Sequence, residues 1–155
     1  EVLERNLRIT PEAMHYGQGI TTLASFLTQS SNNAAHPANG LAALYLATGQ
    51  DIANIGESNQ CTTYNRVTRD GDYFFSVTLP ALIVASYGGG TNLPTQRECL
   101  QIMDCHGKGK ALKLAEIAAG LVVAGELSLG AATRVDKETR QNEWVDAHER
   151  LGRNR

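Results

Sequence analysis

The sequence predicts an α+β fold that is rich in helix, with a central buried helix packed by other helices and a small β-hairpin. Small and apolar residues fill every side of the run 40–47, which is typical of a helix buried all round. Two β-rich segments, 61–67 and 73–83, flank the polar loop 68–72 and predict a hairpin. With 155 residues, 42% of them hydrophobic and 19% charged, the chain is long enough for one domain with a core.

Composition argues against several classes of partner and site. The net charge is −2, from fourteen basic and sixteen acidic residues, so charge favours neither nucleic acid nor a membrane surface. Three cysteines without a CxxC spacing argue against a disulfide framework, and a reducing cytoplasm is the expected compartment. No signal peptide is recognisable, and no uncharged stretch reaches the roughly 18 residues of a spanning helix, so we expect no membrane segment.

The first elements lead to the central helix. Residues 1–9 are amphipathic. Thr10 is a good helix cap and Pro11 fits the first helical position, which together predict a helix that continues through 13–27. A polar loop at 29–33 then feeds the central helix.

The central helix is expected between His36 and Asp51, a length of about 22 Å at about 1.5 Å per residue. Pro37 suits its first turn. Such a helix would carry Asp51 as a lone carboxylate inside an apolar second half. A carboxylate is rarely buried without a partner, so Asp51 is a candidate acid–base group.

The second half of the chain contains one long helix and a glycine turn. The turn 88–91 either brings backbone amides to a phosphate or makes a sharp strand-to-loop turn, and the glycines alone favour the second interpretation. A helix is expected over 94–103 and a long apolar helix over 110–134. Glu126 is the only acid in the apolar part of that long helix, which makes it a second candidate acid.

The remaining histidines and cysteines give weaker signals. His148 lies on an expected last helix among charged residues, where a solvated surface histidine is the simpler interpretation, and His36 could equally be a helix-cap residue. Cys99, Cys105 and His106 fit no standard zinc spacing, so no metal site is expected. From the residues alone, the chain is an α-rich domain with a candidate acid–base site.

Four segments extend this interpretation because they resemble, in the same order, segments of 3-hydroxy-3-methylglutaryl-CoA (HMG-CoA) reductase: NAAHPANGLAALYLATGQDIA, VTLPALIVASYGGGTNLPTQRECL, AGELSLGAA and AHERLGRNR. The resemblance covers most of the chain. It implies part of that enzyme's large domain and the four-electron reduction of HMG-CoA to mevalonate and coenzyme A by two NADPH. It also implies a homodimer, or a higher homo-oligomer, with active sites between subunits.

The resemblance assigns roles by position. Asp51 matches the family's catalytic aspartate, and His148 matches the histidine that protonates the departing CoA thiolate. The family's remaining positions fall on His36, Asn39, Leu129 and Ala132 for the substrate, and on Tyr87 and Gly88 for NADPH.

Departures from the family pattern leave two interpretations open. The family's catalytic glutamate and lysine lie upstream, as does its small cofactor-binding domain, so residues 1–155 are expected to be the C-terminal portion of the catalytic domain. A further family lysine would fall between 13 and 33, where this chain has none. The chain is therefore either part of a reductase, or a diverged non-catalytic homologue acting as an interaction module or a CoA- or nucleotide-binding module.

Overall fold

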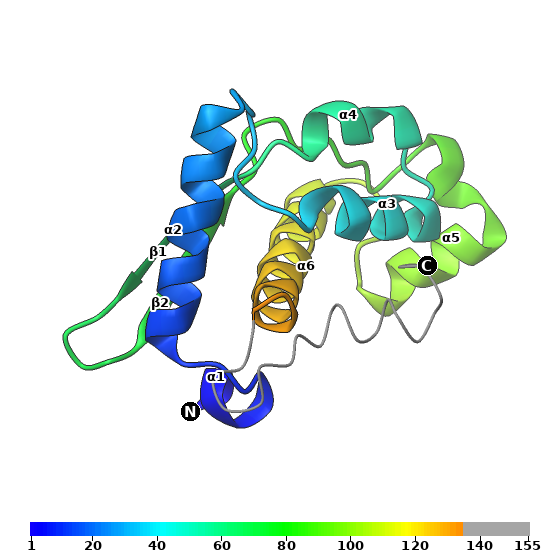
Figure 1. Ribbon diagram of the computed structural model, residues 1–155. Coiled ribbons are helices and arrows are strands. Elements are labelled where there is room, and N and C mark those ends of the chain that lie inside the picture. The colour runs from blue at the N-terminus through cyan, green and yellow to red at the C-terminus, as the bar shows by residue number, and fades with distance from the viewer. Residues whose placement is uncertain (135–155) are drawn as a thin grey trace, which may run out of the picture.

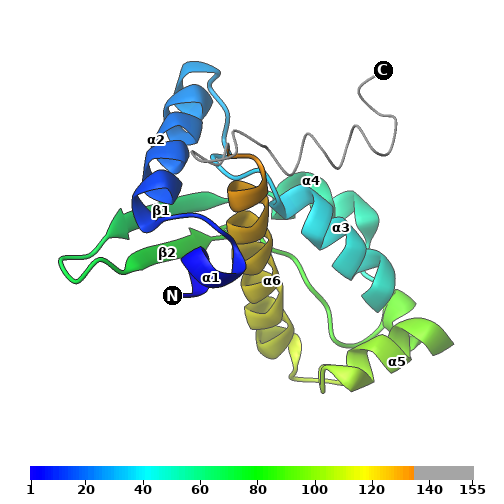
Figure 2. The same ribbon diagram turned by 60° about the horizontal axis from the view of Figure 1, so that its bottom comes forward.

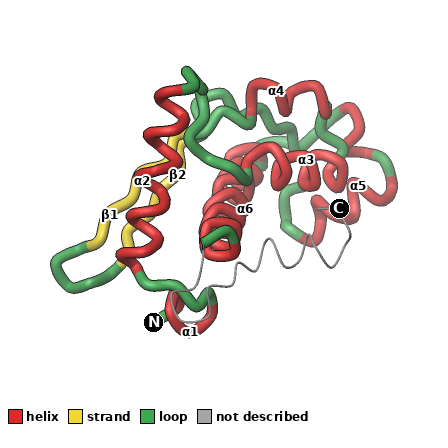
Figure 3. Tube along the Cα trace, in the orientation of Figure 1, coloured by secondary structure: helices red, strands yellow, loops and turns green. Residues whose placement is uncertain are grey.

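The computed structural model describes residues 1–134, which form a helix-rich chain with one two-stranded antiparallel sheet (Figures 1 and 3). The elements follow in the order α1 (Val2–Asn6), α2 (Pro11–Leu27), α3 (Pro37–Thr48), η1 (Ile52–Asn54), α4 (Ile55–Ser58), β1 (Thr62–Val67), β2 (Tyr73–Thr78), η2 (Gly89–Asn92), α5 (Pro94–Ile102) and α6 (Ala111–Ala132). The predicted α+β class is confirmed. The expected last helix and His148 lie outside the described residues.

Helix α6 runs through the middle of the molecule, with α3 on one side and α2 and the hairpin on the other (Figures 1 and 2). Its buried residues recur every fourth position, at Leu114, Ala118, Val122 and Glu126. Ala118 and Val122 pack in one core cluster with residues of α3. Among the described helices, α6 is the one that is long and apolar enough to cross a membrane. This is weak evidence for a membrane span, because the core helix of a soluble protein passes the same test.

The hairpin forms where the sequence predicts it, but its second strand is shorter. Thr62 pairs with Thr78 and Val67 pairs with Tyr73, and helix α2 packs against β1 while α6 packs against β2. Strand β2 ends at Thr78, two positions before Pro80, whereas the sequence suggested a β-rich run to 83. Proline cannot donate a ladder hydrogen bond, which accounts for the earlier end.

The expectation of a helix buried all round from His36 to Asp51 is wrong in two respects. Helix α3 ends at Thr48, because Gly49 follows in the left-handed region at φ +68 and caps it. Only one stripe of α3 is buried, whereas the side chain of Leu46 is 67% exposed. Alanines fill much of the outer side, and their small size hid this amphipathic pattern in the sequence.

Candidate functional site

A pocket of about 590 Å³ opens at the C-terminal end of α3. Two turns form its walls: the turn 49–51 that follows α3 and the glycine turn 88–90 that precedes α5. Three residues that the resemblance assigned to catalysis and cofactor binding line this pocket together, namely Asp51, Tyr87 and Gly88. The structure therefore joins positions that are far apart in the sequence.

The two turns meet through glycine backbones. A Cβ atom on Gly49 would overlap the carbonyl of Gly90, and a Cβ atom on Gly90 would lie 2.7 Å from the Gly49 carbonyl oxygen. Any larger residue at either position would force the turns apart. The buried Thr91 side chain donates a hydrogen bond of 2.6 Å to the Gly88 carbonyl, which holds the glycine turn in shape.

The side chain of Gln50 fastens the segment that leads to the glycine turn. Its Oε1 accepts from the Ala85 N–H at 2.6 Å, and its Nε2 donates to the Ala85 carbonyl at 2.9 Å. Nearby, the Tyr45 hydroxyl donates to the Ile83 carbonyl at 2.5 Å. Sequence reasoning missed Gln50, although a polar side chain directly after a helix-ending glycine was an available signal.

Asp51 lies at the edge of the pocket and is exposed. Its Oδ1 accepts from the Ala53 N–H at 3.0 Å and caps the short helix η1. The expectation that Asp51 is a carboxylate inside an apolar core helix is wrong, because the chain has already left α3 at Gly49. The acid–base hypothesis therefore depends on its place in the pocket rather than on burial.

The glycine turn presents open backbone to the pocket. Gly88 and Gly89 have φ values of +88 and +53, and a Cβ atom on either would meet nothing within 4 Å. The turn is thus a sharp one whose peptide groups a ligand can approach closely. Tyr87, 56% exposed, offers a ring beside it. These features suit the phosphate or ring of a nucleotide cofactor.

The N-terminal end of α3 is held by a buried carboxylate. Glu126 is only 7% exposed, and its Oε1 accepts from the Ala35 N–H at 2.7 Å and from the His36 N–H. A negative charge is favourable there because the helix dipole is positive at that end. The sequence singled out Glu126 as an acid in an apolar helix, and the structure supplies its partners.

The ring of His36 packs where two glycines leave room. A Cβ atom on Gly125 would overlap this ring, and a Cβ atom on Gly40 would lie 2.5 Å from its Nε2. The buried Nε2 atom has no hydrogen-bond partner among the described residues.

The other predicted substrate residues lie away from the pocket lining. Asn39 is exposed in the first turn of α3, and Leu129 and Ala132 are partly buried at the end of α6. The structure thus separates the predicted site residues: Asp51, Tyr87 and Gly88 lie at the pocket, His36 and Asn39 at the N-terminal end of α3, and Leu129 and Ala132 at the end of α6, with His148 outside the described residues. Their roles remain predictions.

The three cysteines are free thiols, and residues 1–134 contain no group of histidine, cysteine and acidic side chains that could hold a metal ion. Cys61 is buried in the core cluster beside α3. Burial and then the negative charge of Glu126 raise the pKa of Cys61, and together they bring it to about 11. The N-terminal end of α3 and the core beneath it are therefore electrostatically linked.

Known proteins resemble this chain over nearly its whole length. The family model described as hydroxymethylglutaryl-coenzyme A reductase matches residues 1–153. The 3-hydroxy-3-methylglutaryl-coenzyme A reductase of Pyrococcus abyssi is 42% identical over 161 residues, which cover 99% of this chain and 38% of that protein. The protein of the same name from Methanocaldococcus jannaschii is 44% identical over 131 residues, which cover 84% of this chain and 31% of that protein. The chain thus spans well under half the length of these relatives, and it belongs to the hydroxymethylglutaryl-coenzyme A reductase family.

Proposed function

We propose that this chain is part of an enzyme that reduces HMG-CoA to mevalonate and coenzyme A with NADPH. The observation that carries the proposal is the pocket that Asp51 lines together with the turn from Tyr87 to Gly90, in a chain of this family. The relatives are named for the same reductase activity. The catalytic glutamate, lysine and cofactor domain expected for the family would come from other parts of the complete protein.

The residues of this chain divide the work of the reaction. NADPH, when bound, supplies the hydride. The open peptide groups of Gly88 and Gly89 and the ring of Tyr87 would hold the cofactor beside the substrate. Asp51 would hold or deliver a proton where negative charge develops on the substrate carbonyl oxygen. His148 would protonate the CoA thiolate as it leaves, a role in which a positioned acid contributes about 10²–10⁴-fold.

A homo-oligomer is part of the proposal, and the outer face of α2 supports it. Tyr16, Ile20, Leu23 and Leu27 lie on this face at alternating spacings of four and three, and each is more than half exposed. The opposite face carries the two buried residues of α2, Met14 and Gln18, and Gln18 donates to the Thr63 hydroxyl at 2.8 Å. An apolar stripe on the outside of a helix is typical of an interface.

We also propose a cytoplasmic location. It is supported by the three free thiols, because thiols persist where the compartment is reducing.

A second candidate function is binding of coenzyme A or a nucleotide without turnover. It is favoured by the segment 13–33, where the family lysine is expected and the buried polar side chain is the neutral Gln18. A neutral amide cannot supply the positive charge of that lysine to a developing oxyanion.

The decisive experiment is Asp51→Asn in the complete protein that carries this chain. We expect turnover of HMG-CoA to fall by about 10²–10⁴-fold, because the amide cannot transfer the proton. The fold should survive, because Asp51 is exposed. Asp70→Asn, in the exposed hairpin loop, is the matched control and should keep full activity.

Two outcomes would contradict the reductase proposal. Unchanged turnover in Asp51→Asn would remove Asp51 from the chemistry. A wild-type protein that binds NADPH or coenzyme A in calorimetry yet does not oxidise NADPH with HMG-CoA would support the binding module instead.

A further inference from the structure

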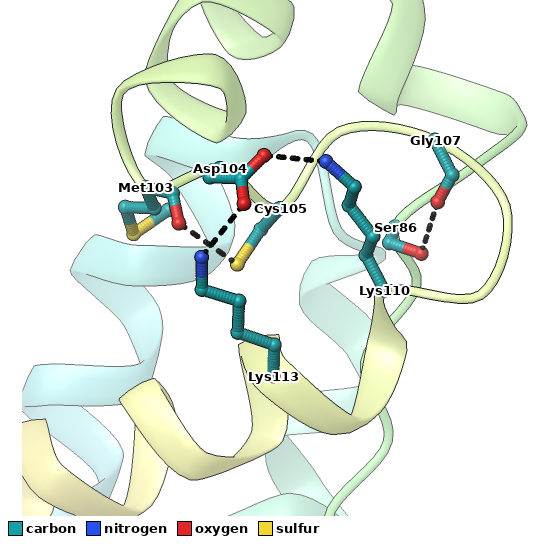
Figure 4. A network of polar contacts seen from close by, with 7 residues as sticks. All are labelled: Ser86, Met103, Asp104, Cys105, Gly107, Lys110 and Lys113. Atoms are coloured by element: carbon teal, nitrogen blue, oxygen red, sulfur yellow. Dashed lines mark hydrogen bonds and ion pairs between the residues drawn. The ribbon is translucent and has the colours of Figure 1, made fainter.

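The loop between α5 and α6 is fastened to Ser86, two positions before the glycine turn (Figure 4). Ser86 and Gly107 exchange two hydrogen bonds of 2.7 Å, one from the Ser86 hydroxyl to the Gly107 carbonyl and one from the Gly107 N–H to the Ser86 carbonyl. Ser86 is buried and directly precedes Tyr87. The loop residue after Gly107 is therefore held close to the wall of the pocket.

That next residue is Lys108, whose Nζ lies 5.2 Å from the centre of the Tyr87 ring. Tyr87 lines the pocket, so the ammonium group contacts the ring of a wall residue, although Lys108 itself is not part of the lining. A cation–π contact at an exposed site is weak. An anionic ligand in the pocket can therefore draw the ammonium group away from the ring at small cost.

The other two lysines of this region are already paired. The carboxylate of Asp104 forms ion pairs with the Nζ of Lys110 at 2.5 Å and with the Nζ of Lys113 at 3.0 Å (Figure 4). Hydrogen bonds from Lys110 and then Lys113 lower the pKa of Asp104 to about 2, so this carboxylate stays ionised near neutral pH. Within residues 1–134, Lys108 has no carboxylate partner. Among these three lysines, Lys108 is therefore the one whose positive charge is not neutralised by a carboxylate of the described residues.

Two glycines in the left-handed region flank Lys108. Gly107 and Gly109 flank it with φ values of +113 and +82, and a Cβ atom on either would meet nothing within 4 Å. Glycine adopts this left-handed backbone without strain, so the two glycines let the chain turn tightly on either side of Lys108 while Gly107 stays bonded to Ser86.

We propose that Lys108 binds a phosphate group of the ligand in this pocket. A lysine offers a point charge suited to phosphate, and the open peptide groups of Gly88 and Gly89 offer the neighbouring donors. The ligand class is a phosphorylated nucleotide, either a nicotinamide dinucleotide or coenzyme A. This inference deepens the proposed function and rests on it.

The test measures binding rather than turnover, by calorimetry on the complete protein with NADPH, NADH and coenzyme A. In Lys108→Gln we expect at least one of these ligands to bind about tenfold more weakly, since a hydrogen bond to a charged group is lost. Lys108→Arg should bind nearly as well as the wild type. Lys113→Gln removes the same charge from a lysine paired with Asp104, and its affinities should stay within about twofold.

The three ligands distinguish the sources of phosphate. Weaker binding of NADPH alone assigns Lys108 to the extra phosphate of that dinucleotide, and equal weakening of NADPH and NADH assigns it to their shared pyrophosphate. Weaker binding of coenzyme A alone assigns Lys108 to a phosphate of coenzyme A. Affinities within about twofold of wild type for all three ligands overturn the inference while leaving the reductase proposal intact. A wild-type protein that binds none of the three overturns both.

Discussion

The two ends of α3 are joined to the rest of the molecule by opposite means. At the C-terminal end the backbones of Gly49 and Gly90 approach closely, and the neutral amide of Gln50 pairs with Ala85. At the N-terminal end a buried charge, that of Glu126, receives two backbone N–H groups. The C-terminal end requires glycines without side chains, and the N-terminal end requires the carboxylate of Glu126. Different substitutions should therefore damage each end.

The largest effect is expected from Gly49→Ala at the C-terminal end. The new Cβ atom would overlap the Gly90 carbonyl and would also require a left-handed φ of +68. Since backbone cannot rotate away as a side chain can, we expect a loss of about 4 kcal/mol in the free energy of unfolding. Denaturant unfolding measures this loss, and a fluorescent nucleotide titration measures damage to the pocket.

Gly71→Ala is the matched control for this clash. Gly71 also has a positive φ, +83, but a Cβ atom there would meet nothing within 4 Å. It should cost only the conformational term of about 1–2 kcal/mol. Equal losses in the two variants would show that φ, and not the approach of the two turns, limits this end of α3.

An intermediate effect is expected at the N-terminal end from Glu126→Leu. Leucine removes the acceptor of the Ala35 and His36 N–H groups, and we expect a loss of about 2 kcal/mol, because two part-buried backbone donors lose their partner. Glu126→Gln keeps an acceptor oxygen and should lose less. Thermal unfolding monitored by circular dichroism compares the two.

Glu116→Gln tests whether position on α6 matters. Glu116 lies on the same helix but is exposed, so this substitution should change stability by less than about 0.5 kcal/mol. If Glu126→Leu proves as mild as this control, the N-terminal end of α3 does not depend on the buried charge.

Local chemistry made much of the fold predictable. Pro11 and Pro94 mark the starts of α2 and α5, and the polar loop 68–72 marks the hairpin. Glu126 was found because an acid in an apolar helix must have a partner once buried. The proline and loop signals lie within a few residues of the features that they predict, whereas the partners of Glu126 lie 90 and 91 positions away and came only from the structure.

Tertiary contacts explain what the sequence could not show. The pairing of Gln50 with Ala85 joins residues 35 positions apart, and although the place of Gln50 after Gly49 was a signal, nothing in either segment names the partner. The exposed position of Asp51 was missed because the alanine-rich run predicts a helix that continues past Gly49, whereas α3 ends at Thr48. Roles assigned by resemblance placed Asp51, Tyr87 and Gly88 in one site, and the pocket brings them together without testing those roles.

The pKa of the Cys61 thiol responds to the charge of Glu126 at the N-terminal end of α3. Its thiol pKa is raised from 9.0 to about 11, first by burial and then by Glu126. The folded protein keeps the thiol neutral while the unfolded chain ionises, so the unfolded state binds fewer protons in this range. The stabilising contribution is therefore complete below pH 9.0 and is lost as the pH rises toward 11.

The smallest effect is expected on that thiol in Glu126→Gln. Burial remains and the charge is removed, so the pKa of Cys61 should fall only part of the way from about 11 toward 9.0. An NMR titration of the Cys61 side chain measures it. Gln50→Ala, at the opposite end of α3, removes no charge and should leave this pKa unchanged. An equal fall in both variants would mean that loosening of the core, rather than the charge of Glu126, sets the thiol pKa, and the electrostatic distinction between the two ends would fail.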